Sequence, residues 1–520
     1  RYENMNNMRV STNGGLVTEN WFDLNASRYT PSSTLQRMEL LKTGYMGTLS
    51  LGWDNYLFLE LTGRQERSST LKDQSFFYPS TNLSFLFTQA FHMPSWWNYG
   101  KLRLSYGIVG NAPETYTANI VYEQGSDNGF TWNTIPSSWG NADIRPEKKY
   151  EYEIGLESKF LNNRLGIDIS YYNNRVKDQI LSTPQPSTSG VKNVLMNVGE
   201  VANRGWDISI SATPILTRDF RWDLTANYGV YKNKVVKLAD GVPYLEILNS
   251  GGSGIKIQAV EGQPMGDIYA QVPQVNENGE YLVSDKGLYL NQTELQKVGN
   301  INPAGVGGLF NSFSYKNVFL DFSIDFRIGG DVINEMNQYA TAVGLTPESL
   351  KYRDTEHGGL SYYYPGDNNS SGIPVQVDPS TGAGPNGEII YHDGIILPGV
   401  VASTGERNTR IIPAGYYYNT TYNWGTEAEQ LTYRHSVFDN SYVKLRELTI
   451  GYQFPEKMIS KLGLGRLSVS VFGRNLFYFY KALKNYDAES SVGTSWANQA
   501  TVGSSTTATR SFGVSLRASF

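Results

Sequence analysis

The sequence contains no cysteine, so disulfide bonds and thiolate metal sites are excluded. It also has no apolar run near the roughly 18 residues that a membrane helix needs. The 520 residues carry a formal net charge of only -5 and no basic stripe, which argues against a nucleic-acid binder. A membrane β-barrel is not excluded, because its strands alternate apolar residues with polar ones that face the lumen and so contain no long apolar run.

A signal peptide is not recognisable either. The chain opens on Arg1-Tyr2-Glu3-Asn4, a polar stretch without the basic region, apolar core and cleavage site of a secretory signal. Such a start alone would suggest a cytoplasmic protein, but the rest of the pattern contradicts that. We therefore expect Arg1 to be internal to a longer precursor.

Alternation of apolar and polar residues predicts about fourteen strands, most clearly at 318–329. Its even positions from 320 to 328 are apolar, whereas Asp321, Asp325 and Arg327 lie between them. Side chains at period two face opposite sides of a strand, so one face suits lipid and the other a wet lumen. A half-buried sheet in a soluble protein would show the same split, so the loop lengths must distinguish a membrane barrel from a soluble sheet. The predicted strands are 21–29, 42–53, 56–68, 82–91, 101–110, 150–160, 164–176, 201–213, 220–232, 307–316, 318–329, 442–454, 466–478 and 509–520.

The connections between these segments alternate between long and short. Links after odd segments have about 12 residues or more, and links after even segments about 1 to 11, as at Asp54-Asn55, Leu161-Asn162-Asn163 and Lys316-Asn317. Outer-membrane barrels have short periplasmic turns and longer extracellular loops. The alternation therefore predicts that odd strands run outward, and that the last strand ends at the periplasmic face on Phe520. A terminal aromatic residue on such a strand is typical of substrates of the barrel-assembly machinery.

These patterns predict an all-β fold, a transmembrane antiparallel β-barrel with about 14 strands in residues 1–520. Loops longer than about 15 residues are uncommon in compact domains and are usually functional. Here they make up much of the chain, so lids or docking surfaces outside the cell are expected. The predicted extracellular loops are about 111–149, 233–306, 330–441 and 479–508.

Five short stretches have distinctive spacings of glycine, asparagine and charged residues. They are NVGEVANRG at 197–205, EGQPMG at 261–266, GNINP at 299–303 with GGL at 307–309 and GGDVIN at 329–334, YVKLRELTIGY at 442–452, and GRNLF at 473–477. Taken in this order, they resemble the SusC/RagA family of TonB-dependent outer-membrane transporters of Bacteroidetes. The glycines in strands, such as Gly205 and Gly451, would relieve crowding. Arg446 and Glu447, as strand neighbours, are expected to face opposite sides.

The resemblance implies a larger protein than this chain. The family has a signal peptide, often an extra N-terminal domain, a TonB-contacting segment, a plug and roughly 22 strands. The plug domain and the N-terminal strands are absent from this chain, and eight further strands would complete such a barrel. We therefore expect the C-terminal barrel portion of a transporter. A complete fourteen-stranded barrel is the structural alternative.

The resemblance also implies a function, active import of an oligomeric nutrient, glycan or peptide, across the outer membrane. The implied partners are a SusD-like surface lipoprotein, TonB-ExbB-ExbD acting through the missing plug, and outer-membrane lipid, with a possible dimer of transporter–lipoprotein pairs and no nucleic acid. Lid opening, capture, closure and plug displacement would be population shifts rather than bond chemistry. A passive outer-membrane channel and an enzyme with a site in the loops are the alternatives.

Catalytic and metal-binding signals are weak, so we expect no enzyme, no metal and no cofactor. The chain shows no G-x-S-x-G or H-E-x-x-H motif. Asp487-Ala488-Glu489 offers too few oxygen ligands for a Ca²⁺ site. The four histidines are best explained by an interfacial turn at the membrane surface and by exposed loop positions; they are His92, His357, His392 and His435.

Aromatic clusters are the better candidates for ligand binding. Tyrosine offers apolar area and a hydroxyl group, which suits sugars or peptides. Tyrosine is also abundant, with 36 residues, so the same side chains could equally pack the loop or contact a partner. The candidate ligand-binding residues are Tyr362, Tyr363, Tyr364, Tyr416, Tyr417 and Tyr418.

Overall fold

The computed structural model describes residues 1–72, 75–127, 130–184, 188, 190–191, 193–250, 254–366, 372–423, 432–460, 463–491, 493, 495–503 and 508–519. The chain divides into two compact units, and each is treated separately below. Unit 1 comprises Arg1–Asn162, Asp168–Gly205 and Asn233–Pro243, and unit 2 comprises Asn163–Ile167, Trp206–Lys232 and Tyr244–Phe520.

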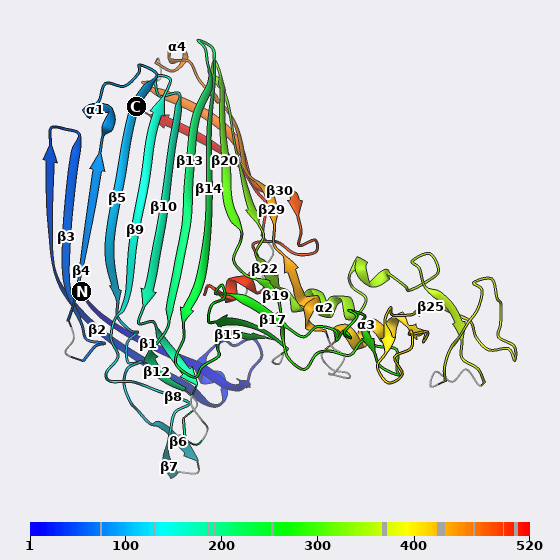
Figure 1. Cartoon of the computed structure of the whole chain (residues 1–520). Helices are drawn as coiled ribbons and strands as arrows, with labels where there is room; N and C mark the ends of the chain where they lie inside the picture. Colours follow the sequence, from blue (N-terminus) through cyan, green and yellow to red (C-terminus); the bar gives the residue numbers. More distant parts are fainter. Residues whose placement is uncertain are drawn as a thin grey trace. The chain divides into compact units, whose positions relative to one another are not determined.

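Fourteen strands form one antiparallel sheet in which neighbours along the chain are neighbours in the sheet, which confirms the predicted fold class (Figure 1). In sheet order they are β1 (Tyr2–Leu16), β2 (Ser27–Trp53), β3 (Leu57–Ser68), β4 (Ser75–Phe85), β5 (Trp97–Asn111), β9 (Glu147–Phe160), β10 (Leu165–Lys177), β13 (Glu200–Leu216), β14 (Phe220–Lys237), β20 (Gly305–Tyr315), β21 (Val318–Ile328), β29 (Tyr442–Gln453), β30 (Arg466–Lys481) and β31 (Ser511–Ser519). Thirteen of the fourteen predicted segments each correspond to a different one of these strands, and the segment 21–29 shares only residues 27–29 with β2.

The predicted first strand at 21–29 is wrong. Most of that segment is a turn and the short 3-10 helix η1 (Leu24–Ala26), which begins where the Asp23 carboxylate accepts a hydrogen bond from the Asn25 amide at 2.7 Å. The first strand is instead β1, which pairs with the first half of β2 from Leu16 opposite Ser27 to Tyr2 opposite Leu41. Both partners mix polar and apolar residues on each face there, so alternation gives no clear signal.

The strict alternation of link lengths also fails at one point. The link between β3 and β4 covers only residues 69–74, whereas the next link, 86–96, is longer and contains the short helix α1 (Phe87–Ala90). The predicted strand at 82–91 therefore begins too late and ends too late. Phe76 belongs to β4 and packs with the buried Leu71 in unit 1, so the apolar residues before Pro79 extend the strand rather than the loop.

The predicted short turns are confirmed, and their residues adopt the backbone that these turns need. Asp54 and Asn55 have φ values of 48° and 56°, Asn162 and Asn163 of 57° and 63°, and Lys316 of 51°. Asparagine and aspartate adopt this left-handed region more readily than most residues. The hairpins therefore turn tightly where the sequence indicated.

In each unit, apolar residues line up across the sheet in rows whose members are partly or largely exposed. Unit 1 carries the row Leu51–Leu59–Leu83–Leu104–Ile154, and unit 2 the row Trp222–Phe313–Leu320–Ile450–Val471–Val514. Leu51 is 52% exposed and Val514 is 72% exposed. Rows of this kind are what a lipid-facing barrel wall needs. None of the helices in the described parts of the chain is long and apolar enough to cross a membrane.

Gly451 illustrates how closely the strands of unit 2 pack. It lies opposite Phe319, and a Cβ atom at Gly451 would approach the Phe319 ring to within 2.1 Å. The expectation that this glycine relieves crowding is therefore confirmed.

The long links are folded rather than loop-like. In unit 1 they hold the sheets β11–β12–β8 and β6–β7, and in unit 2 the sheets β15–β16–β17–β19, β24–β23–β25–β27, β22–β28 and β18–β26. Their bounds are β6 (Glu123–Asp127), β7 (Phe130–Thr134), β8 (Ser138–Trp139), β11 (Ile180–Pro184), β12 (Asn193–Asn197), β15 (Tyr244–Ser250), β16 (Ile255–Val260), β17 (Asp267–Ala270), β18 (Leu282–Val283), β19 (Gln296–Asn300), β22 (Asp331–Ile333), β23 (Leu360–Tyr363), β24 (Val375–Gln376), β25 (Tyr391–Ile395), β26 (Val400–Val401), β27 (Ile412–Pro413) and β28 (Val437–Asp439).

The link between β21 and β29 also contains the helices α2 (Glu335–Ala342) and α3 (Ala414–Tyr422), and α4 (Glu456–Ile459) follows β29. Buried Ile257, Ile268 and Ile333 form one hydrophobic core in unit 2 from three different strands. These links therefore have cores of their own. The predicted terminal residue Phe520 lies outside the described residues.

Candidate functional site

A β-bulge in β29 turns three charged side chains toward one face of the sheet. Ser323 lies opposite Glu447 and Asp325 opposite Lys444, so β29 has one more residue than β21 between these pairs. Such a bulge re-aims side chains. Lys444, Arg446 and Glu447 all lie on the face of Ser323 and Asp325, and the expectation that Arg446 and Glu447 face opposite sides is wrong.

A second irregularity lies next to it in β30. Asn475 has a φ of 52° inside the strand, where the register with β29 shifts between Leu445 and Glu447. Its side-chain oxygen accepts a hydrogen bond from Nη1 of Arg446 at 2.9 Å, and its Nδ2 donates to the carbonyl oxygen of Thr509 at 3.3 Å. Asn475 thus joins two strands to the end of the following loop.

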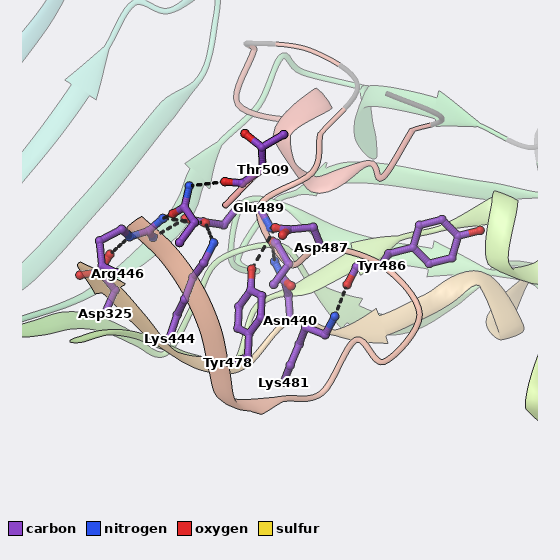
Figure 2. Close-up of polar contacts among 12 residues, drawn as sticks. Asp325, Asn440, Lys444, Arg446, Tyr478, Lys481, Tyr486, Asp487, Glu489 and Thr509 are labelled. Atoms are coloured by element: carbon purple, nitrogen blue, oxygen red, sulfur yellow. Dashed lines mark hydrogen bonds and ion pairs between the residues drawn. The ribbon is translucent and has the colours of Figure 1, made fainter. Parts of the chain in front are cut away.

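Glu489, in the loop after β30, is the centre of this polar network (Figure 2). Its carboxylate accepts hydrogen bonds from Nη1 and Nη2 of Arg446 at 2.9 and 2.6 Å and from Nζ of Lys444 at 2.6 Å. Arg446 also donates from Nε to Asp325 at 2.5 Å, and Lys444 is only 1% exposed. Burial would raise the pKa of Glu489, but the hydrogen bonds from Arg446 and Lys444 outweigh it and lower that pKa to about 2.

Further contacts fix the same loop. The Tyr478 hydroxyl donates to Asp487 at 2.9 Å, Nζ of Lys481 donates to the Tyr486 carbonyl at 2.7 Å, and Nδ2 of Asn440 donates to the Ala488 carbonyl at 2.9 Å. We call this set the anchor cluster. It comprises Asp325, Asn440, Lys444, Arg446, Asn475, Tyr478, Lys481, Asp487 and Glu489.

The anchor cluster explains two stretches that the sequence singled out. Lys444 and Arg446 belong to YVKLRELTIGY, and Asn475 belongs to GRNLF. The carboxylates of Asp487 and Glu489, which we considered for Ca²⁺, bind protein groups instead. Among the described residues, no group of three or more potential metal ligands occurs. The anchor cluster therefore has a structural role, because it fixes the loop after β30 to the strands of the sheet.

The first tyrosine run lies mainly in the core of the largest loop. Tyr362 is 1% exposed and donates its hydroxyl to Asp393 at 3.1 Å, and Tyr364 packs with it edge to face, 5.5 Å between ring centroids. Ile411 completes this hydrophobic cluster. Tyr363 is half-buried in β23, opposite Val375.

The second tyrosine run lies in the first turns of α3. Tyr418 is buried and donates its hydroxyl to the Glu348 carbonyl at 2.9 Å, and Arg353 lies over its ring at 5.2 Å. Tyr416 and Tyr417 are half-buried and pack against the cluster around Ile412. Tyr362 and Tyr418 therefore pack the interior of the loop, which was one of the alternatives that the sequence left open.

Tyr364 and Tyr416, one from each run, meet at a pocket of about 400 Å³. Both residues of β27 line it, and Lys286 and Arg410 are the cationic residues of its described lining. The described lining residues are Lys286, Tyr364, Gly372, Pro374, Arg410, Ile411, Ile412, Pro413 and Tyr416. Neither cation of this pocket was among the predicted site residues, because each is isolated in the sequence.

The histidines have four separate surroundings. His92 is exposed, and His357 contacts Asp354 through Nδ1 at 2.7 Å. His392 contacts the Ser361 hydroxyl at 2.9 Å. His435 stacks on Tyr422 with 4.4 Å between ring centroids, and burial lowers its pKa to about 4, so it is neutral at physiological pH.

Comparisons with known proteins agree with this fold. The family model described as "TonB dependent receptor-like, beta-barrel" matches residues 2–260. TonB-dependent receptor P3 of Formosa agariphila is 24% identical over 86% of this chain and 42% of its own length. TonB-dependent receptor SusC of Bacteroides thetaiotaomicron is 30% identical over 44% of this chain and 24% of its own length. The chain thus spans less than half the length of these relatives.

Solved structures show the same fold. The structure of the RagAB peptide transporter superposes with a TM-score of 0.66 at 18% sequence identity, covering 94% of this chain and 50% of that chain. The chain therefore has the β-barrel fold of TonB-dependent receptors, a fold that implies the outer membrane. Within that class it is a relative of SusC and of the Formosa receptors, which confirms the SusC/RagA resemblance.

Proposed function

We propose that this chain is the C-terminal barrel portion of an outer-membrane importer of an oligomeric nutrient, a glycan or a peptide. The observation that carries the proposal is the fourteen-stranded antiparallel sheet with exposed apolar rows, joined to large folded links. Relatives named as TonB-dependent receptors and the RagAB peptide transporter support it. In this proposal the chain contributes the wall and the loops of a barrel of about 22 strands.

The proposal includes partners and an orientation. TonB-ExbB-ExbD supplies energy through a plug encoded upstream, and a SusD-like lipoprotein closes over the loops, with a dimer of such pairs as the assembly. The barrel-assembly machinery inserts the chain with its C-terminus in the periplasm. The separate surroundings of the histidines favour transport over catalysis, so no enzymatic step is assigned.

The test uses the full-length gene in a bacterium that lacks its own copy. We expect the restored strain to take up radiolabelled oligosaccharides or peptides only while tonB is intact, and to lose uptake when the region upstream of residue 1 is deleted. Uptake that survives both changes contradicts energised import. A stable open conductance of the 520-residue chain in planar bilayers would then favour the passive channel.

The enzyme alternative has its own experiment. Alanine at His357, His392 and His435 removes the three histidines of the largest loop. If the purified protein shows a hydrolase activity that these substitutions abolish, the loops carry an enzyme. We expect no activity to depend on them.

A further inference from the structure

We propose that the hairpin β6–β7 is a platform for a neutral oligosaccharide, whose sugar rings stack on Trp132 and Phe130. This inference rests on the proposed function, because it names neutral glycans as the substrate class that a loop of the transporter captures. β6 and β7 form a two-stranded sheet in the link between β5 and β9, within unit 1 (Figure 1). Large exposed aromatic residues on such a hairpin mark a surface that another molecule covers.

Trp132 and Phe130 lie on the same face of the hairpin. Trp132 lies opposite Gly125, and Phe130 precedes Trp132 by two residues on β7. Side chains two residues apart point to the same side of a strand, with about 7 Å between their Cα atoms. Trp132 is 46% exposed and Phe130 is 77% exposed. Two aromatic rings on one side of the hairpin are therefore open to solvent.

Gly125 fixes how the indole ring of Trp132 lies. A Cβ atom at Gly125 would come within 2.6 Å of the indole Cε2 atom and within 2.7 Å of Cζ2 and Nε1. Because Cε2 is a ring-fusion atom and is the nearest, the ring lies with its face over Gly125 rather than with its edge toward it. Glycine on β6 permits this close approach. The hairpin thus covers one face of the indole ring, and the other face is a flat apolar surface.

The charges around this platform favour a neutral ligand. The sequence contains no lysine or arginine between Ala112 and Ile144, whereas the exposed Glu123 lies on β6 on the same face as Gly125. A carboxylate or sulfate group of a ligand would therefore meet a negative side chain of this link and no cation of it. Sugar hydroxyl groups suit these surroundings, because the Glu123 carboxylate accepts hydrogen bonds from them while the sugar rings pack on the aromatic rings.

The test is fluorine-19 NMR of the full-length protein, labelled with fluorotryptophan and held in phospholipid nanodiscs, which avoids detergents with sugar headgroups. Trp132→Phe removes one resonance and so assigns it to Trp132. The probes are the neutral maltohexaose, cellohexaose and laminarihexaose, the acidic hexagalacturonate, and the peptide hexaalanine.

We expect at least one neutral hexasaccharide to shift the Trp132 resonance until it saturates. An open face contacts its ligand from one side, so the dissociation constant should be on the order of 1 mM. Hexagalacturonate and hexaalanine should bind at least about tenfold more weakly.

Phe130→Ala removes the second ring, and we expect it to weaken neutral-sugar binding at Trp132 by about fivefold. Thr131→Ala is the matched control, because Thr131 is exposed on the same strand and faces the opposite side of the hairpin. Its affinity should equal that of the wild type. Tryptophan resonances that keep their positions show that both variants fold, and the titration of the wild type decides the inference if Phe130→Ala does not.

Four results overturn the inference. They are a Trp132 resonance that no neutral hexasaccharide moves, tighter binding of hexagalacturonate or hexaalanine than of every neutral sugar, neutral-sugar binding that a folded Phe130→Ala leaves unchanged, and a resonance that moves with protein concentration alone, which shows that a second copy covers the hairpin. Failure of the proposed import looks different. There, neutral sugars still shift the Trp132 resonance of the purified protein, but cells take them up without TonB.

Discussion

The guanidinium group of Arg446 holds the carboxylate of Glu489 with two parallel hydrogen bonds, of 2.9 and 2.6 Å, across 43 residues of sequence. Paired bonds of this kind are among the stronger polar contacts in proteins. Lys444, almost without solvent exposure, shares the same carboxylate. The loop after β30 is thus held to β29 by the ion pairs of Glu489 with Arg446 and with the buried Lys444.

Glu489→Gln should release this loop. The substitution keeps the shape of the side chain but leaves the buried Lys444 without its counter-charge, which costs about 3 kcal/mol in comparable cases. Hydrogen–deuterium exchange of residues 482–491 and 495–503 should rise markedly. Glu447→Gln is the control, because the Glu447–Arg474 pair is well exposed and should contribute less than about 1 kcal/mol. Equal exchange in both variants would show that the anchor has no special role.

The anchor should also depend on pH. The pKa of Glu489 is about 2, below its ordinary value of 4.5, so ionised Glu489 favours the anchored loop. The stabilisation is complete above about pH 4.5 and is lost as the pH falls through about 2. Exchange of the loop should therefore increase between these pH values in the wild type. Glu489→Gln should show a smaller increase over the same range, and an identical pH profile would contradict the assignment.

Asn475 offers a test that separates backbone from side chain. Asn475→Ala places an alanine at a φ of 52°, which strains the backbone and removes the hydrogen bonds to Arg446 and Thr509. Asn475→Gly removes only the side-chain bonds. We expect alanine to destabilise the protein by about 1 kcal/mol more than glycine, measured as the difference in unfolding by denaturant. The same loss in both variants would place the whole effect in the side chain.

The exposed apolar rows make a prediction about lipid. Val514→Arg puts a charge on the outer face of β31, where barrels lose about 2–4 kcal/mol at the membrane midplane and less near its surfaces. Ser515→Arg puts the same charge on the opposite face and should be tolerated. Folding efficiency of the full-length protein into lipid vesicles measures both. If the two variants fold equally well, Val514 does not face lipid.

The sequence predicted strands accurately where apolar residues alternate with polar ones, which are the strands that carry the apolar rows. Strands such as β21, with an apolar residue at every second position, were located to within a few residues. β1 and the first half of β2 mix polar and apolar residues on each face, so the segment from Tyr2 to Leu41 shows no clear alternation. Phe76 falls in the link between the predicted strands 56–68 and 82–91, although it belongs to β4.

Only part of the anchor cluster could be predicted from the sequence. Lys444 and Arg446 stand in a recognisable stretch, but their partner Glu489 comes more than 40 residues later, and alternation says nothing about such a pair. The bulge that brings Lys444, Arg446 and Glu447 to one face also breaks the period of two. An asparagine among the aromatic residues of β30, Asn475, is the signal that could have indicated it, because asparagine tolerates the left-handed region.

The anchor cluster has a consequence for assembly. Arg446 joins Asp325 on one neighbouring strand, Asn475 on the other and Glu489 in the loop, so all its bonds form only when three strands are aligned. A slip of one residue turns each side chain to the opposite face. Misaligned strands would leave Lys444 charged and unpaired in the interior. The anchor cluster therefore favours the native register of β21, β29 and β30. The loop after β30 can be held in place only when these three strands have paired in that register.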